Sequence, residues 1–130
     1  MFIQQLNVAQ QAALFCFSKQ LIAADNNIDD RELFVLETIK AQCDTTTDFE
    51  ATVQLSSLSA LFIEPSQKAA FMFELIGVAY ADEQIQESEQ VLISQIAEIL
   101  NIATSHLEEI KNWVQRQLIL VNEAKQIMER

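Results

Sequence analysis

The chain reads Ala24-Asp25-Asn26-Asn27-Ile28-Asp29-Asp30-Arg31-Glu32, and 57 residues later it reads Ala81-Asp82-Glu83-Gln84-Ile85-Gln86-Glu87-Ser88-Glu89. The same offset aligns the pair Ala12-Ala13 with Ala69-Ala70, and Ile39 with Ile96. A repeat of this length usually represents one supersecondary unit written twice. We therefore predict two equivalent helical hairpins, in which an acidic turn joins an apolar helix to an amphipathic helix.

The composition predicts one all-α domain over residues 1–130. The length falls in the usual range for a single domain, and half of the residues are hydrophobic, enough for a sizeable core. One glycine and one proline are far below the average usage of about 7% and 5%. Sheets and β-hairpins need such turn residues, so we expect a compact bundle of about six helices built from two pseudo-repeated hairpins.

The charge narrows the classes of partner. The net charge is −11, with nine acids and three bases in residues 1–65 and ten acids and five bases in residues 66–130. Without a basic stripe to neutralise phosphates, no nucleic-acid partner is expected, and anionic membrane surfaces repel the chain. The most apolar run, residues 69–81, contains Glu74 and is too short for membrane insertion. A cation or a basic protein partner suits this charge.

The cysteines and the N-terminus indicate the compartment. Cys16 and Cys43 lie among apolar residues without a close-spaced partner, so we expect two buried free thiols in a reducing environment. The first residues lack the basic segment of a signal peptide. The sequence therefore predicts a cytoplasmic protein.

Apolar periodicity predicts the helices and their places. The first and fourth expected helices are apolar on nearly every side, so they should form the centre of the bundle. The second and fifth carry one apolar stripe each and should cover that centre. The repeat halves are about 8–45 and 65–102. The expected helices span residues 4–24, 30–43, 48–60, 66–81, 87–100 and 104–129.

The sixth helix differs from the others because it extends for about 25 residues, or roughly 37 Å at about 1.5 Å per residue. Thr104 and Ser105 are candidates for its N-cap, and His106 is expected to be exposed in its first turn. Either the helix lies along the first helix, or its far end meets another chain and forms a homodimer. Its apolar stripe consists of Leu107, Ile110, Val114, Leu118, Val121 and Met128.

The acidic turns supply the candidate site. Carboxylates at a helix N-terminus stabilise the helix as caps or through its dipole, which explains Asp29, Glu32, Glu87 and Glu89 without any ligand. Asp25 and Asp82 follow helix C-termini, where the dipole disfavours an anion. The alternative is a site for Ca²⁺ or Mg²⁺, since the groups offer oxygen ligands only. The candidate metal ligands are Asp25, Asp29, Glu32, Asp82, Glu87 and Glu89.

At these residues the chain resembles the TerB-like family, which includes the tellurite-resistance protein TerB and the N-terminal domain of the DjlA co-chaperone. The family pattern looks like Ala-Asp-Gly-x-Ile-Asp-x-x-Glu, used twice, and the likeness covers about residues 8–115. The first copy is matched by Ala24-Asp25, Ile28-Asp29 and Glu32, and the second by Ala81-Asp82, Ile85 and Glu89.

Three positions depart from the family pattern. Asn26 and Glu83 replace the glycine, and Gln86 replaces the second aspartate. The resemblance implies a helical fold, acidic residues that bind divalent cations, and protein partners in stress and metal-ion (tellurite) response. Gln86 removes one carboxylate from the second turn, so the first turn should bind a cation better.

Enzyme chemistries find little support in the residues. A di-iron bundle needs two Glu-x-x-His motifs, and His106 is the only histidine. A serine triad lacks its Gly-x-Ser-x-Gly turn, because Gly77 is the only glycine. Cysteine catalysis needs an exposed, activated thiolate. We therefore expect a non-enzymatic protein-interaction module that uses the acidic turns as its recognition surface. The alternatives are a weak Ca²⁺ or Mg²⁺ binder or sensor, and a structural homodimer.

Overall fold

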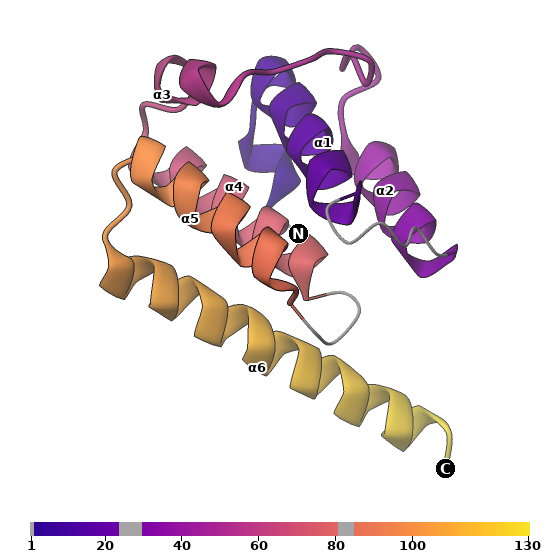
Figure 1. Cartoon of the computed structure of the whole chain (residues 1–130). Helices are drawn as coiled ribbons and strands as arrows, with labels where there is room; N and C mark the ends of the chain where they lie inside the picture. The colour runs from indigo at the N-terminus through magenta and orange to yellow at the C-terminus, as the bar shows by residue number, and fades with distance from the viewer. Residues whose placement is uncertain (1, 24–29, 81–84) are drawn as a thin grey trace.

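The computed structural model describes residues 2–23, 30–80 and 85–130, and these residues form six α-helices, two short 3-10 helices and no strand (Figure 1). This confirms the all-α prediction. The elements, in chain order, are η1 (Ile3–Gln5), α1 (Val8–Ala23), α2 (Asp30–Gln42), η2 (Leu55–Ser57), α3 (Leu58–Leu61), α4 (Pro65–Ala79), α5 (Glu87–Ile99) and α6 (Thr104–Met128).

The helix boundaries follow the 57-residue offset. Adding 57 to the first residues of α1 and α2 gives the first residues of α4 and α5, and the last residue of α2 maps onto the last of α5. The two central helices also touch at equivalent positions, because the Gln10 amide nitrogen donates a hydrogen bond of 3.0 Å to the Gln67 side-chain oxygen. The predicted repeat is therefore visible in the fold. The expected superposition of Asp25 on Asp82 lies outside the described residues.

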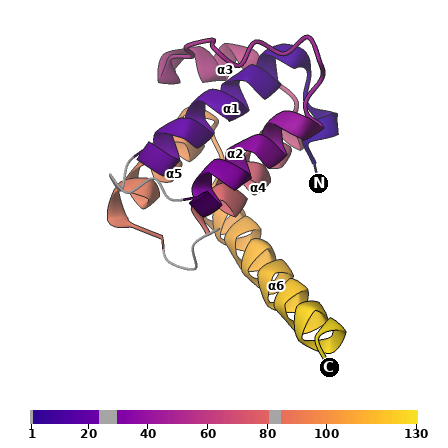
Figure 2. The ribbon, with the colours of Figure 1, turned by 90° about the vertical axis from the view of Figure 1, so that its right-hand side faces the viewer.

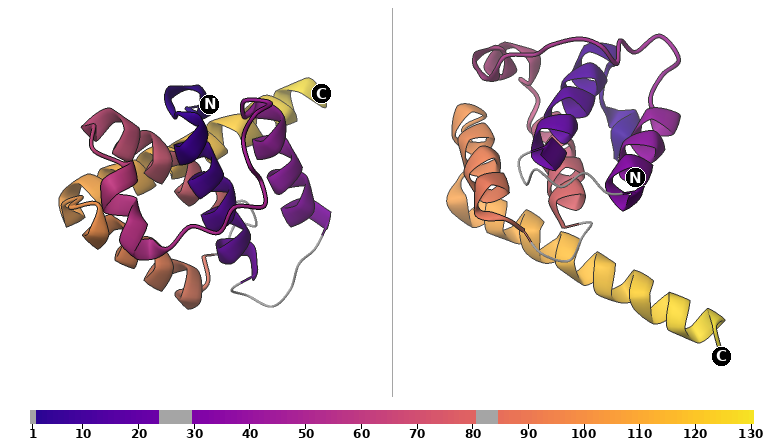
Figure 3. Two further views of the ribbon diagram at one scale, coloured as in Figure 1. Left: turned by 90° about the horizontal axis from the view of Figure 1, so that it is seen from above. Right: turned by 45° about the vertical axis from the view of Figure 1, so that its right-hand side comes forward.

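α1 and α4 form the centre, as predicted, with α2 against α1 and α5 against both central helices (Figure 3). Their contact is built from side chains that are fully buried, including Leu14, Phe17, Phe71 and Leu75. Phe71 lies edge-on to Phe17 and 4.5 Å from the ring centre of Phe62. This packing fixes α4 as the support for the outer helices.

α1 begins later than expected. Asn7 caps the helix, because its side-chain oxygen accepts a hydrogen bond of 2.8 Å from the backbone N–H of Gln10, whose own side chain accepts one of 3.0 Å from the backbone N–H of Asn7. This reciprocal cap satisfies two backbone donors and makes the helix begin at Val8. The prediction of helix over residues 4–7 was wrong, since these residues include the separate turn η1.

The expected third helix is mostly absent. Only residues 55–60 of the predicted 48–60 segment are helical, as η2 and most of α3, which ends at Leu61. The preceding chain is fixed by side chains of α1 instead. Lys19 Nζ donates to the Phe49 carbonyl at 3.2 Å, and the buried Gln11 accepts 2.8 Å hydrogen bonds from Asp44 N and Thr47 Oγ1. These bonds replace helical hydrogen bonds.

α5 ends in a Schellman motif. Asn101 adopts a left-handed φ of 57°, and the backbone N–H of Ile102 donates to the Ala97 carbonyl at 2.9 Å. Asparagine tolerates this conformation better than other non-glycine residues. The turn reverses the chain into α6, whose N-cap position is Ala103, without a side-chain cap. The predicted capping by Thr104 or Ser105 was therefore wrong.

α6 packs along α4 rather than along α1, so the expected contact with the first helix was wrong. Its first half buries Leu107, Ile110 and Val114 against the core. Its far half extends past the rest of the bundle in both side views (Figures 1 and 2). Among the helices in the described ranges, none is both long and apolar enough to cross a membrane.

Candidate functional site

Of the six predicted metal ligands, the structure describes Glu32, Glu87 and Glu89. Asp25, Asp29 and Asp82 lie outside the described residues. Glu32 and Glu89 occupy equivalent places in the first turns of α2 and α5 and are only 8% and 5% exposed, whereas Glu87 is exposed. Within residues 2–23, 30–80 and 85–130, no three His, Cys, Asp or Glu residues gather as a metal-binding group. The cation site stays a prediction.

The carboxylate of Glu89 has a structural role. Its Oε1 accepts a hydrogen bond of 3.1 Å from the backbone N–H of Gln86, the N-cap residue of α5. This is the glutamate half of a capping box, which satisfies a backbone donor left free at the helix start. The capping explanation is therefore confirmed for Glu89. Figures 1 and 2 show the first turns of α2 and α5 at the same end of the bundle.

A groove crosses α4 between α2 and α6. Its α2 side is a hollow of about 220 Å³ between Phe34 and the α4 residues Glu74 and Gly77. Its α6 side is a hollow of about 240 Å³ that shares Glu74 and Gly77 and reaches Trp113 and Gln117. Because the two hollows have the same floor residues, we treat them as one surface, the α4 groove.

Gly77 lies in the floor of the α4 groove. It is the only glycine of the chain and lies inside a 15-residue helix. Apart from its chain neighbours and the backbone of its own helix, nothing approaches within 4 Å of the place that a Cβ atom would occupy. Glycine in a helix interior destabilises by about 0.5–1 kcal/mol relative to alanine. Packing within the described chain therefore does not require glycine at this position.

Aromatic side chains form the α6 wall of the groove. Phe73 lies edge-on to Trp113 with ring centres 5.1 Å apart, and Phe2 lies 5.0 Å and 5.7 Å from these two rings. Phe34 forms the opposite rim of the groove. Its side chain is 72% exposed, although α2 also contributes the buried Ile39 to the core. Aromatic rims of this kind supply large apolar contact area to a ligand.

Glu74 places a negative charge in the middle of this apolar surface. The carboxylate is half-buried, and its Oε1 accepts a 2.7 Å hydrogen bond from the backbone N–H of Phe2. Burial raises the pKa of the nearby Cys43 thiol, and the negative charge of Glu74 raises it further. The groove therefore favours a cationic group over an anionic one.

The two cysteines differ in environment. Both are free, as predicted, but only Cys16 is buried, where its sulfur accepts from the Val53 backbone N–H at 3.5 Å. Cys43 is half-buried, so the prediction of two buried thiols was wrong for this residue. Its raised pKa disfavours the thiolate that nucleophilic catalysis needs.

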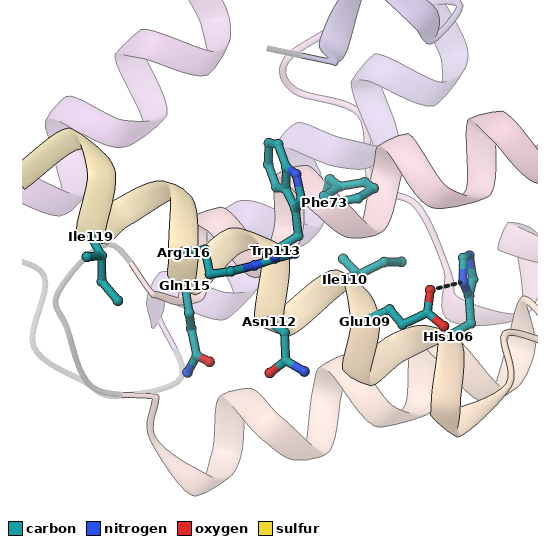
Figure 4. A pocket seen from close by; sticks show the side chains of 9 residues that line it. All are labelled: Phe73, His106, Glu109, Ile110, Asn112, Trp113, Gln115, Arg116 and Ile119. Atoms are coloured by element: carbon teal, nitrogen blue, oxygen red, sulfur yellow. Dashed lines mark ion pairs between the residues drawn. The ribbon is translucent and has the colours of Figure 1, made fainter.

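A further hollow is a shallow surface along α6, with a volume of about 720 Å³ (Figure 4). Its lining side chains do not converge, since Phe73 and Trp113 lie on one side of the helix and Asn112 and Gln115 point away from them. His106 is exposed in the first turn of α6, as predicted, and approaches Glu109 at 3.9 Å in open solvent. The arrangement encloses no reaction site.

Sequence reasoning did not identify Gly77, Phe34 or Trp113 as site residues. One signal was present, because a solitary glycine inside a strongly helical segment is a local exception that needs a packing or functional reason. The joining of α2, α4 and α6 into one groove was not visible, since it depends on which face of α4 each helix covers.

The fold is an all-α domain built from two equivalent pairs of helices, α1 with α2 and α4 with α5. The helices α1 and α4 form its centre, and α6 packs along α4. A buried glutamate lies at the start of both α2 and α5. The chain belongs to the tellurite resistance protein TerB family, whose model matches residues 19–112. This confirms the resemblance seen in the acidic turns. Comparisons with curated proteins and with solved structures gave no match.

Proposed function

We propose that the chain is a non-enzymatic protein-interaction module of the TerB family, and that the α4 groove binds an apolar segment of a partner protein that carries a basic side chain. A role in stress or metal-ion (tellurite) response is part of this proposal and is suggested by the family's description as a tellurite resistance protein; the cytoplasmic location is carried over from the sequence. Glu32, Glu87 and Glu89, in the first turns of α2 and α5, would add a negative field at one end of the bundle and steer a basic partner toward it.

The observation that carries the proposal is the open floor at Gly77. Gly77 weakens its own helix, and no close packing in the described chain requires a glycine there. The space beside it can therefore hold an atom of a partner. The surrounding surface suits one occupant chemistry. Phe34 and Trp113 provide apolar walls, and Glu74 provides the partner for a lysine or arginine.

A random peptide library displayed on phage supplies a defined probe. We expect the selected peptides to combine apolar residues with lysine or arginine, and their binding to weaken as salt rises. Gly77→Gln introduces a better helix former, but its side chain fills the groove, so binding should fall at least about tenfold, or 1.4 kcal/mol. Gly77→Ala places a single methyl group in the same space, so it should weaken binding measurably but less than Gly77→Gln.

A second matched pair tests the rim. Phe34 and Ile63 are 72% and 73% exposed, but only Phe34 borders the groove. Phe34→Ser should weaken the peptides, whereas Ile63→Ser should not. Peptides that bind Gly77→Gln as well as the unaltered chain would reject the groove as the binding surface.

The alternative function is a weak Ca²⁺ or Mg²⁺ site at the acidic turns. The observation that favours it is the burial of Glu32 and Glu89 at equivalent positions at one end of the bundle. Because Gln86 replaces an aspartate, Asp25→Asn should abolish most cation-induced stabilisation, and Asp82→Asn should remove less. A cation present at about 100 times its Kd should raise the free energy of unfolding by roughly 2.7 kcal/mol. A melting temperature unmoved by millimolar Ca²⁺ or Mg²⁺ would dismiss this function.

A further inference from the structure

The segment that precedes α1 enters the α4 groove. Phe2 lies directly before η1 and lines the α6-side hollow of the groove together with Gly77 and Trp113. The centre of its ring lies 5.0 Å from that of Phe73 and 5.7 Å from that of Trp113. The turn η1 contacts both α2 and α4. The segment therefore reaches from the α2 side of the groove to the α6 side.

Phe2 makes both kinds of contact that the groove offers to a partner. Its ring packs on the aromatic wall, and its backbone N–H donates a 2.7 Å hydrogen bond to Oε1 of Glu74. A hydrogen bond to a carboxylate is stronger than one between two neutral groups. An apolar group beside a donor to Glu74 is also the chemistry of the proposed partner. Phe2 therefore holds a position in the groove for which a partner can compete.

The attachment of Phe2 allows it to leave the groove while the rest of the segment stays in place. Ile3 and Leu6 are buried, and their carbonyl oxygens accept hydrogen bonds of 3.4 Å and 3.0 Å from the Gln11 amide nitrogen. Phe2 is half-buried, and its carbonyl accepts a 3.1 Å bond from the N–H of Gln5. Rotation about the Cα–C bond of Phe2 moves its ring and its N–H together but leaves this carbonyl in place. Extended values of ψ are allowed at its φ of −106°.

We propose that Phe2 is an internal ligand of the α4 groove, and that a partner displaces it with an aromatic side chain next to a lysine or arginine. This inference rests on the proposed function and adds the residue that regulates it. The vacated space lies against Phe73 and Trp113 and therefore favours a ring. The basic group exchanges a neutral donor on Glu74 for a positive charge.

Removal of the Phe2 ring should strengthen peptide binding, because a groove that is open in only a fraction of the molecules binds more weakly by that fraction. An aromatic pair corresponds to roughly two- to tenfold in an equilibrium constant. Phe2→Ala removes two pairs, so the Kd of phage-selected peptides should fall at least about fourfold. Phe2→Leu keeps apolar bulk without the ring, and its Kd should lie between the two.

Gln4→Ala is the matched control, because it changes an exposed side chain of the same segment. It should leave the Kd measured by isothermal titration calorimetry unchanged. Circular dichroism should show equal helix content in all of these variants, since the buried anchors Ile3 and Leu6 are retained.

NMR spectra can report the displacement itself. In the free chain, the Phe2 N–H is bonded to Glu74 and should give a downfield amide signal that exchanges slowly with water. At saturation with peptide, this signal should move upfield and exchange faster. The N–H of Leu6, which donates to the Ile3 carbonyl at 3.0 Å, should keep its signal and serves as the internal control.

A Kd that rises in Phe2→Ala would overturn the proposal, because Phe2 would then be a fixed part of the wall. An unchanged Kd, or a Phe2 amide signal that stays in place at saturation, would also overturn it. If the unaltered chain captures no peptide, Phe2→Ala should capture peptides, and capture by neither would overturn both proposals. The proposed function alone fails by a different result, namely peptide binding that Gly77→Gln does not weaken.

Discussion

Replacing Gly77 by alanine should stabilise the protein, because the fold carries the weakness of glycine without using its small size. Gly77 lies inside α4, between helical neighbours, and has no left-handed φ. Alanine is preferred over glycine in helix interiors by about 0.5–1 kcal/mol. Beyond its chain neighbours and the backbone of its own helix, the new methyl group meets no atom within 4 Å, so steric strain should subtract nothing from this gain.

This gain in the free energy of unfolding is measurable by urea unfolding, where the dependence on urea concentration should stay unchanged, and by calorimetry. For a domain of this size, 0.5–1 kcal/mol corresponds to a rise in Tm of about 2–5 °C. A lower free energy of unfolding for Gly77→Ala would show that the position is filled in solution, and the reasoning that led to the α4 groove would be refuted. Gly77→Gln should also be at least as stable as the unaltered chain, which separates loss of binding from loss of fold.

Three further substitutions test local features. Asn7→Ala removes the cap of α1 and should lower the free energy of unfolding by about 1 kcal/mol in urea titrations; no change would mean that the cap does not form. Ser18 has a buried hydroxyl without a hydrogen-bond partner among the described residues, so Ser18→Ala should leave stability equal or raise it by about 1 kcal/mol. The Cys43 thiol has a pKa above its ordinary 9.0 in the folded chain, so its contribution to stability is complete below pH 9 and is lost as the pH rises through the folded pKa. The free energy of unfolding of the Cys43→Ala variant should therefore fall less steeply with pH, between about pH 9 and 11, than that of the unaltered chain. Equal pH dependence in the two proteins would contradict the raised pKa of Cys43.

The repeated part of the fold was predictable because its signals are local. Pro65 begins a helix, as its missing N–H allows, and the apolar pattern around it has its copy 57 residues earlier. Where a polar side chain intervened, the prediction failed. Gln10 reads as an ordinary helix residue in sequence, yet its hydrogen bonds with Asn7 set the start of α1.

The candidate site was less accessible to sequence reasoning because it depends on tertiary packing. The apolar stripe of α6 is equally compatible with α1 and α4, and only the structure selects α4. That choice brings Trp113 beside Phe73 and creates one wall of the groove. The acidic turns, by contrast, were evident in sequence, and the structure assigns a capping role to Glu89.

The most direct test of the proposed function is a ¹H–¹⁵N NMR titration with a phage-selected peptide. Gly77 and Trp113 are the only residues of their kinds, so the glycine amide and the indole N–H each give a distinctive signal, and both border the α4 groove. We predict that both signals shift together and saturate with the affinity of the peptide. Saturable binding that leaves both signals in place would contradict the α4 groove as the interaction site.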